Sequence, residues 1–252
     1  MFFSEIFYLC FMLQKTRAVV LYNVNYSDAY SIVHVYTEEF GLASYLTAKT
    51  KSRKAKVPKS IFHALSVVEL ETDHKNLREI QRIKEAKIHF PLYSVLNNPV
   101  KSAISIFIAE FISKVIREVQ PNKYLFDYIL QSLQVLELVE KNFANFHLVF
   151  MIRLSQFLGF YPDATSYEKG MFFDMQNGTF VSFKPTHPHF FNPDESQVFY
   201  YLLRMDYENM SNFKFSRHER KEIIHRIIDY YRLHLNTLPE IKSLEVLHEV
   251  FG

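Results

Sequence analysis

The chain has 252 residues and a hydrophobic content of 48%, enough for a packed core in one large domain or two smaller ones. Five glycines nearly exclude a glycine-rich phosphate loop, and the single cysteine, Cys10, excludes both an intrachain disulfide and a cysteine zinc cluster. The net charge of +2 is unevenly distributed, because residues 1–90 carry +4 and residues 91–252 carry −2.

Residues 1–11 form an apolar start that lacks a positive n-region and contains Glu5. This stretch is too short to span a membrane and is a poor signal peptide. We therefore expect an N-terminal extension outside the folded domain, with Met12 as the better start. The protein is expected in the reducing cytoplasm, with no membrane contact.

Short apolar runs separated by turns occupy residues 12–90. They are rich in β-branched and aromatic side chains, and Gly41 separates two of them. Such runs are typical of strands in a small barrel or sandwich. The expected strands are residues 18–22, 30–36, 42–47, 65–71 and 80–88.

A dense basic segment lies in the long connection between the third and fourth of these strands. Six Lys or Arg side chains fall within eleven residues, and no acid interrupts them. On a near-neutral chain this pattern indicates a polyanionic partner, most commonly nucleic acid, and the alternative is a solvated loop without a ligand. The basic segment comprises Lys49, Lys51, Arg53, Lys54, Lys56 and Lys59.

Tyrosines lie close to this basic segment in the predicted strands, and aromatic faces among cations suit the stacking of single-stranded bases. Most aromatic side chains of strands belong to a core, so we expect about one or two of the candidates on a binding face. The candidates are Tyr22, Tyr26, Tyr30, Tyr36 and Tyr45.

The apolar period changes from 2 to 3.6 residues at Asn98, which marks the start of helices. Asn98 suits an N-cap and Pro99 suits the first helical position, and the apolar stripe continues until Pro121 stops it. Gly159 is suited to ending a later helix. Further helices are expected at about residues 124–141, 144–158 and 194–204.

Residues 160–193 interrupt the helical pattern with prolines and glycines. A hairpin around residues 176–178 is expected there. Ser216 and Glu219 form a capping box before a last long helix. The prediction is an α+β multidomain protein, with a β domain at residues 12–90 and an all-α domain at residues 91–252 that carries this insertion.

Motifs for nucleotide hydrolysis and for α/β-hydrolase chemistry are absent from the sequence. Two Glu-x-x-His spacings, Glu222 to His225 and Glu245 to His248, can place both groups on one metal in a helical bundle, although charged outer helix faces also explain them. A metal-dependent enzyme therefore stays open as an alternative class. A weaker zinc candidate comprises His187 and His189 with Asp174 or His218.

Basic groups of the helical half can flank an apolar groove that suits an acidic peptide ending in apolar residues. A plain amphipathic bundle explains the same pattern. A protein-interaction module with an incidental basic loop is thus a third possible class. The basic groups are Lys114, Arg117, Lys123 and Arg153.

The chain resembles the bacterial RecO family of recombination mediators from about Met12 to Phe251. Lys15-Thr-Arg-Ala-Val-Val-Leu21 is similar to the family's opening strand, and Phe157-Leu-Gly-Phe-Tyr-Pro-Asp163 is a further match. The matches keep a shared order along the chain. The others are residues 26–41 (second strand and turn), 48–53 (basic loop), 65–71, 83–86 and 242–247.

This resemblance implies an N-terminal OB-fold barrel, a C-terminal helical domain and a small inserted subdomain. It also implies binding of single- and double-stranded DNA and cooperation with RecR, single-strand-binding protein and RecA. Many relatives hold zinc through cysteines of the insertion; residues 160–193 contain none, so we expect a metal-free hairpin and no cofactor. Relatives that dock the tail of single-strand-binding protein use arginine where this chain offers His147 and, further on, Arg153.

Together with the basic segment, this resemblance implies a non-enzymatic, nucleoid-associated protein of recombinational repair that anneals DNA strands and helps to load recombinase. Lys15 and Arg17 are expected to extend the DNA path from the basic segment. The expected contacts to a partner peptide are Lys114, Arg117, His147 and Arg153.

Overall fold

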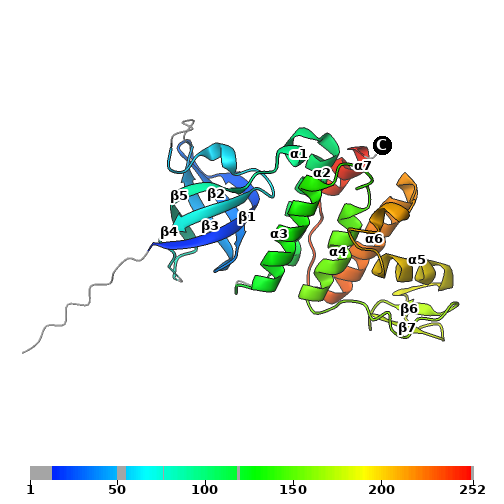
Figure 1. Cartoon of the computed structure of the whole chain (residues 1–252). Coiled ribbons are helices and arrows are strands. Elements are labelled where there is room, and N and C mark those ends of the chain that lie inside the picture. Colours follow the sequence, from blue (N-terminus) through cyan, green and yellow to red (C-terminus); the bar gives the residue numbers. More distant parts are fainter. Residues whose placement is uncertain (1–12, 50–54, 76, 118–119, 251–252) are drawn as a thin grey trace, which may run out of the picture. The chain divides into compact units, whose positions relative to one another are not determined.

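The computed structural model describes residues 13–49, 55–75, 77–117 and 120–250, so the extension expected at residues 1–11 lies outside the described residues. Two structural units divide the chain: Met1–Pro91 with Glu118–Asn122, and Leu92–Arg117 with Lys123–Gly252. Strands make up the first unit and helices most of the second (Figure 1). None of the helices in the described part of the chain is long and apolar enough to cross a membrane.

The first unit is a closed barrel in the order β1-β2-β3-β5-β4. Neighbouring strands are antiparallel except for β3 and β5, which are parallel. This is an OB-like barrel, so the α+β prediction with an N-terminal barrel is confirmed. The strands are β1 (Gln14–Asn25), β2 (Tyr30–Thr37), β3 (Gly41–Ala48), β4 (Val67–Thr72) and β5 (Ile80–Phe90).

Alternate side chains of these strands fill the barrel, as the period of two requires. Val33, Val35 and Tyr45 are fully buried in its interior. Ile61 and Phe62, from the connection between β3 and β4, close the same core. The far end of the connection that carries the basic segment is therefore fixed by packing.

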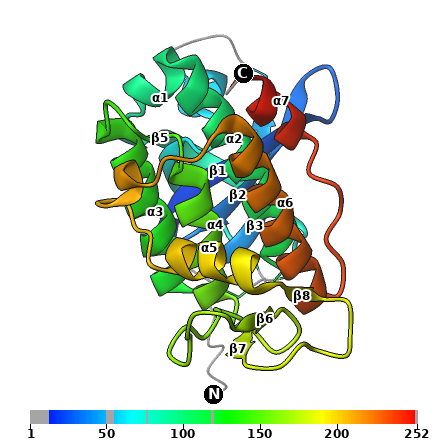
Figure 2. The same ribbon diagram turned by 90° about the vertical axis from the view of Figure 1, so that its right-hand side faces the viewer.

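The second unit consists of helices around an apolar core, with a small sheet inserted between two of them (Figure 2). Phe107, Phe126 and Phe150 are fully buried in this core. The helix α4 packs against α3 on one side and against α5 and α6 on others, and α7 packs on α2. The helices are α1 (Tyr93–Asn97), α2 (Pro99–Val115), α3 (Lys123–Leu138), α4 (Phe146–Phe157), α5 (Pro193–Leu203), α6 (Arg217–His234) and α7 (Ser243–Val250).

Helix boundaries follow the capping residues that the sequence offers. The Asn98 side chain accepts hydrogen bonds from the first turn of α2, and Ser216 and Glu219 form a reciprocal capping box on α6. Gly159 follows α4 with a φ of +83°. The expected stop at Pro121 was wrong, because α2 ends at Val115 and Ile116 is its C-cap.

The inserted sheet has the order β7-β6-β8, with β6 (Phe172–Asp174) and β7 (Thr179–Val181) forming the predicted hairpin and β8 (Phe190–Phe191) pairing with β6. Its core is aromatic. Phe173 is fully buried, and its ring centroid lies 4.6 Å from Phe199 and 4.9 Å from Phe180. Aromatic packing thus occupies the interior of this insertion.

Candidate nucleic-acid interface

A bulge in β1 brings an aromatic side chain to the outer face of the barrel. Val20 pairs with Val35 and points inward, but the register shifts between Val20 and Tyr22, so that Tyr22 lies opposite His34. The bulge adds one residue, Leu21, that has no partner on β2. Without it, the side chain at position 22 would point into the core, because inward positions alternate along a strand. Tyr22 instead stacks on the His34 ring at 4.2 Å between centroids.

The stack continues across β2 and β3. A hydrogen bond of 2.9 Å joins His34 Nδ1 to Ser44 Oγ and fixes the imidazole ring. Partial burial lowers the pKa of His34, so the ring is neutral at pH 7. Tyr22, His34 and Ser44 therefore form one uncharged row across three strands.

A second row on the same outer face is aliphatic. Val24 lies opposite Ile32, and Ile32 lies opposite Leu46. Ile32 and Leu46 are half-buried and Val24 is exposed, although apolar side chains of this size usually avoid solvent. We call the two rows together the outer strip: Tyr22, Val24, Ile32, His34, Ser44 and Leu46.

The turn between β1 and β2 connects the outer strip to the basic segment. Tyr26 and Tyr30 are exposed in this turn, and its backbone is closed by a hydrogen bond from the Tyr26 amide to the Tyr30 carbonyl. The Lys49 amide donates to the Ala29 carbonyl at 2.9 Å, and Lys49 Nζ donates to the Ser27 carbonyl at 2.5 Å. The first cation of the basic segment is thus attached to the turn that carries two exposed tyrosines.

The five candidate tyrosines divide by exposure. Tyr22, Tyr26 and Tyr30 are 44%, 64% and 44% exposed, whereas Tyr36 and Tyr45 are buried. Burial raises the pKa of Tyr45 to about 12, as expected for a core phenol. More tyrosines are exposed than the expected one or two, because the bulge and the turn place three of them outside the core.

Two cations outside the predicted DNA-binding set lie beside the outer strip. Arg82 on β5 is the parallel partner of Leu46, and Lys84 is two residues further along the same face. Both are exposed, and neither forms an ion pair with another described residue. No sequence signal marks this basic edge, because apolar Ile80 is exposed and polar Gln81 is buried, the reverse of what apolar–polar alternation predicts.

Only part of the basic segment can be placed. Lys51, Arg53 and Lys54 lie outside the described residues. Lys56 and Lys59 are exposed, and the Lys56 carbonyl accepts a hydrogen bond of 2.8 Å from the Ala86 amide of β5. The described part of the segment is therefore attached to the barrel at both Lys49 and Lys56.

Lys15 and Arg17 on β1 have acidic neighbours. Arg17 forms a bidentate ion pair with Glu38, with Nε–Oε2 and Nη2–Oε1 distances of 2.7 and 2.6 Å. Lys15 is exposed and lies opposite Glu71 in the β1–β4 ladder. The ion pair compensates most of the Arg17 charge, so Arg17 contributes less to a cationic surface than its sequence position indicates.

The predicted peptide contacts Lys114 and Arg117 hold the C-terminal segment of the chain. Lys114 Nζ donates to Glu110 at 2.5 Å and also to the Glu240 carbonyl, and Arg117 donates to the Thr237 carbonyl. Burial disfavours ionised Glu110, but hydrogen bonds from Lys114, Ser243 and the Lys242 amide outweigh it and lower its pKa to about 2. These groups attach the N-terminus of α7 to α2.

His147 and Arg153 also have structural surroundings. His147 is fully buried, and burial, with lesser contributions from the positive charges of Arg220 and His248, lowers its pKa to about 3. It is therefore neutral and does not reach solvent. Arg153 donates to the Met205 carbonyl at 3.4 Å. The four predicted peptide contacts do not form one basic groove.

A basic pocket of about 270 Å³ lies instead where α4 begins. Asn145 donates to the Met210 and Phe213 carbonyls at 3.1 and 2.8 Å and so fixes the loop that forms one wall. Arg220 donates to the Phe215 carbonyl at 2.5 Å. Apolar side chains and two cations surround the pocket, chiefly Met210, Phe213, Phe215, Lys214 and Arg220.

The candidate metal ligands form other contacts. Across the ranges that the structure describes, no group of three or more His, Cys, Asp or Glu side chains is placed to hold a metal ion. His225 and His248 approach each other to 5.8 Å between ring centroids. His187 Nε2 lies 3.2 Å from Asp174 Oδ1, and Asp174 also accepts from the turn amides of Gln176 and Asn177. Asp174 thus closes the hairpin turn of the insertion.

Comparisons with known proteins cover both units. The family model described as "Recombination protein O N terminal" matches residues 12–92, and that described as "Recombination protein O C terminal" matches residues 96–245. Relatives called DNA repair protein RecO include those of Azobacteroides pseudotrichonymphae (64% identical over 240 residues), Phocaeicola vulgatus (45% over 241) and Porphyromonas gingivalis (34% over 245). The alignments cover 95%, 96% and 95% of this chain and 100% of each relative. The chain therefore belongs to the RecO family of DNA repair proteins.

Proposed function

We propose that the outer strip and the basic segment together bind DNA, and that the protein anneals strands and helps to load recombinase during recombinational repair. The observation that carries the proposal is the juxtaposition of exposed Tyr22 and Tyr30 with Lys49 and Arg82 on one outer face of the barrel. OB-folds bind oligonucleotides on the face of their second and third strands. Stacking on aromatic rings combined with phosphate neutralisation is the usual chemistry of single-strand binding.

This arrangement suits annealing without a covalent step. Bases stacked on tyrosine faces keep their Watson–Crick edges free, because stacking uses only the ring planes. Lysine and arginine side chains reduce the repulsion between two phosphate chains as a second strand approaches. Phosphate contacts carry no base information, so we expect little sequence preference.

For the partner proteins we propose separate surfaces on the helical unit. The acidic tail of single-strand-binding protein is expected in the pocket that Lys214 and Arg220 flank, because this pocket combines cations with an apolar floor. Lys114, Arg117, His147 and Arg153 are less suited to this role, since each is engaged within the protein. RecR and, indirectly, RecA are proposed as partners from the family alone.

The DNA footprint is tested by replacing Lys51, Arg53 and Lys54 with alanine. We expect the slope of log affinity against log salt concentration to become shallower by about two to three units, because each phosphate neutralised contributes roughly −0.7 to −0.9. The measurement is a fluorescence-anisotropy titration with a single-stranded oligonucleotide at several salt concentrations.

In the control, alanine replaces three exposed lysines of the helical unit: Lys141, Lys169 and Lys184. It removes the same net charge from the protein, so a general electrostatic effect would change both slopes equally. An unchanged slope for the first variant, or an equal change in the control, would show that the basic segment is not the footprint.

A further inference from the structure

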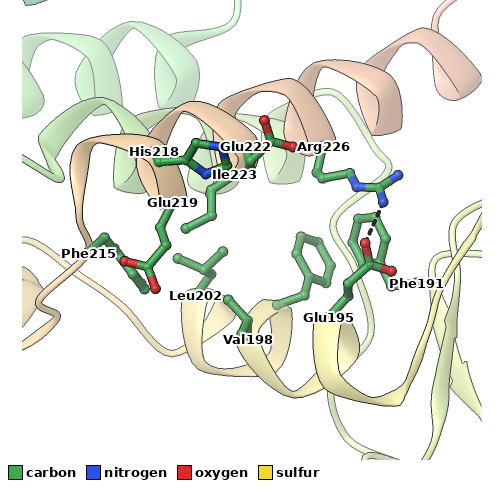
Figure 3. Close-up of a pocket in the computed structure, with 11 residues that line it drawn as sticks. Phe191, Glu195, Val198, Leu202, Phe215, His218, Glu219, Glu222, Ile223 and Arg226 are labelled. Atoms are coloured by element: carbon green, nitrogen blue, oxygen red, sulfur yellow. Dashed lines mark hydrogen bonds and ion pairs between the residues drawn. The ribbon is translucent and has the colours of Figure 1, made fainter. Parts of the chain in front are cut away.

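An apolar groove of about 310 Å³ lies between α5 and α6, and Phe215 lines both this groove and the basic pocket at the start of α4. Figure 3 shows that its side chains come from both helices and face one another, with Phe215 at one end and Phe191 at the other. The floor is formed by Val198, Leu202 and Ile223. Val198 is 42% exposed, so part of the floor is in contact with solvent.

The rim of this groove is acidic. At the Phe191 end, Arg226 pairs with Glu195 across the groove and lies 5.6 Å above the Phe191 ring. Glu219 adds a further carboxylate towards the Phe215 end, and Glu222 adds another between Glu219 and Arg226. Hydrogen bonding to the Ser216 amide lowers the pKa of Glu219, so it is ionised at pH 7.

The rim residues Glu195, Glu219, Glu222 and Arg226 carry a formal charge of −2. This sign disfavours a phosphate chain or an acidic peptide, and it is opposite to that of the basic pocket. A groove between two helices with an apolar floor is the usual seat for an amphipathic segment. Its volume is at the lower end of the range for ligand sites, enough for a few side chains.

We propose that this groove docks a protein segment with two or three large apolar side chains, spaced three or four residues apart and flanked by lysine or arginine. The apolar side chains fill the floor over Val198 and Leu202, and the cations meet Glu219 and Glu222. Neither the DNA interface nor the acidic-tail pocket provides this contact. The groove is therefore a surface for a second, basic protein partner.

The test is a selection of random 12-residue peptides displayed on phage against the immobilised full-length protein. We expect enriched peptides to carry net positive charge and apolar residues at the stated spacing. Their affinity, measured by fluorescence anisotropy on synthesised copies, should fall at least tenfold with Val198→Lys, which places a cation in the groove, and about threefold with Glu222→Gln.

Val246→Lys is the matched control, because Val246 on α7 is 45% exposed and lies outside the groove. It should leave the affinity unchanged, and circular dichroism confirms that each variant is folded. Three outcomes would each overturn the proposal. The selection enriches acidic peptides, it enriches no peptide, or the enriched peptides bind the Val198→Lys variant and the unchanged protein with equal affinity.

Discussion

A protein with both Tyr22 and Tyr30 replaced by alanine is expected to bind a single-stranded oligonucleotide at least about 30-fold more weakly. Each base stacked on an aromatic ring contributes roughly 1–3 kcal/mol, and the double variant removes two such rings. The salt dependence should not change, because no cation is lost. The measurement is the same anisotropy titration, read as affinity at one salt concentration and as slope across several.

The matched control for this prediction is Tyr201→Ala on α5, because that tyrosine is 48% exposed, close to the exposure of Tyr22 and Tyr30. It should bind DNA like the unchanged protein. Equal affinities for the double variant and the control would mean that bases do not stack on Tyr22 and Tyr30. A shallower salt slope in the double variant would indicate that the tyrosines act by positioning Lys49 instead.

Replacing Phe173 with alanine is expected to lower the free energy of unfolding of the helical unit by about 3–5 kcal/mol, the usual cost of removing a buried phenyl group. Phe173 is fully buried, and its ring contacts those of Phe180, Phe191 and Phe199. The insertion is small, so few other contacts compensate for the cavity. Urea denaturation followed by far-ultraviolet circular dichroism measures the change, because the helices dominate that signal.

Phe183→Ala supplies the comparison, since Phe183 lies just after the same hairpin and is 67% exposed. This substitution should lower the free energy of unfolding only slightly. A metal chelator should leave the denaturation midpoint of the unchanged protein as it was, because aromatic packing and the Asp174 turn hold the hairpin. Chelator-induced unfolding, or equal effects of the two phenylalanine substitutions, would contradict this account of the insertion.

Much of the barrel follows from the sequence because its strands alternate between apolar and polar positions. The runs at residues 30–36 and 42–47 correspond to β2 and β3 within two residues at either end. The bulge beside Leu21 does not follow, because residues 18–22 form an unbroken apolar run in which the alternation is hidden. The orientation of Tyr22 depends on that bulge and is therefore visible only in the structure.

The surface of the helical unit proposed for partner binding is less predictable for a different reason. Lys114 and Arg117 bond to carbonyls more than a hundred residues further along the chain, and local periodicity says nothing about such contacts. His147 lies on α4. Residues on most faces of this helix are buried, so no stripe of polar residues in the sequence marks its exposed side. Lys214 and Arg220 line one pocket with Asn145, which holds the loop before Lys214 through the Met210 and Phe213 carbonyls, a contact between segments far apart in the chain.

Photocrosslinking tests most directly whether DNA binds the outer face of the barrel. A single-stranded oligonucleotide substituted with 5-iodouracil is bound to the full-length protein, irradiated, and the attached peptides are identified by mass spectrometry. We predict crosslinks to peptides that contain Tyr22, Tyr26 or Tyr30. Crosslinks confined to residues 123–250, with these three tyrosines unmodified, would contradict the proposal that the barrel's outer face holds the DNA.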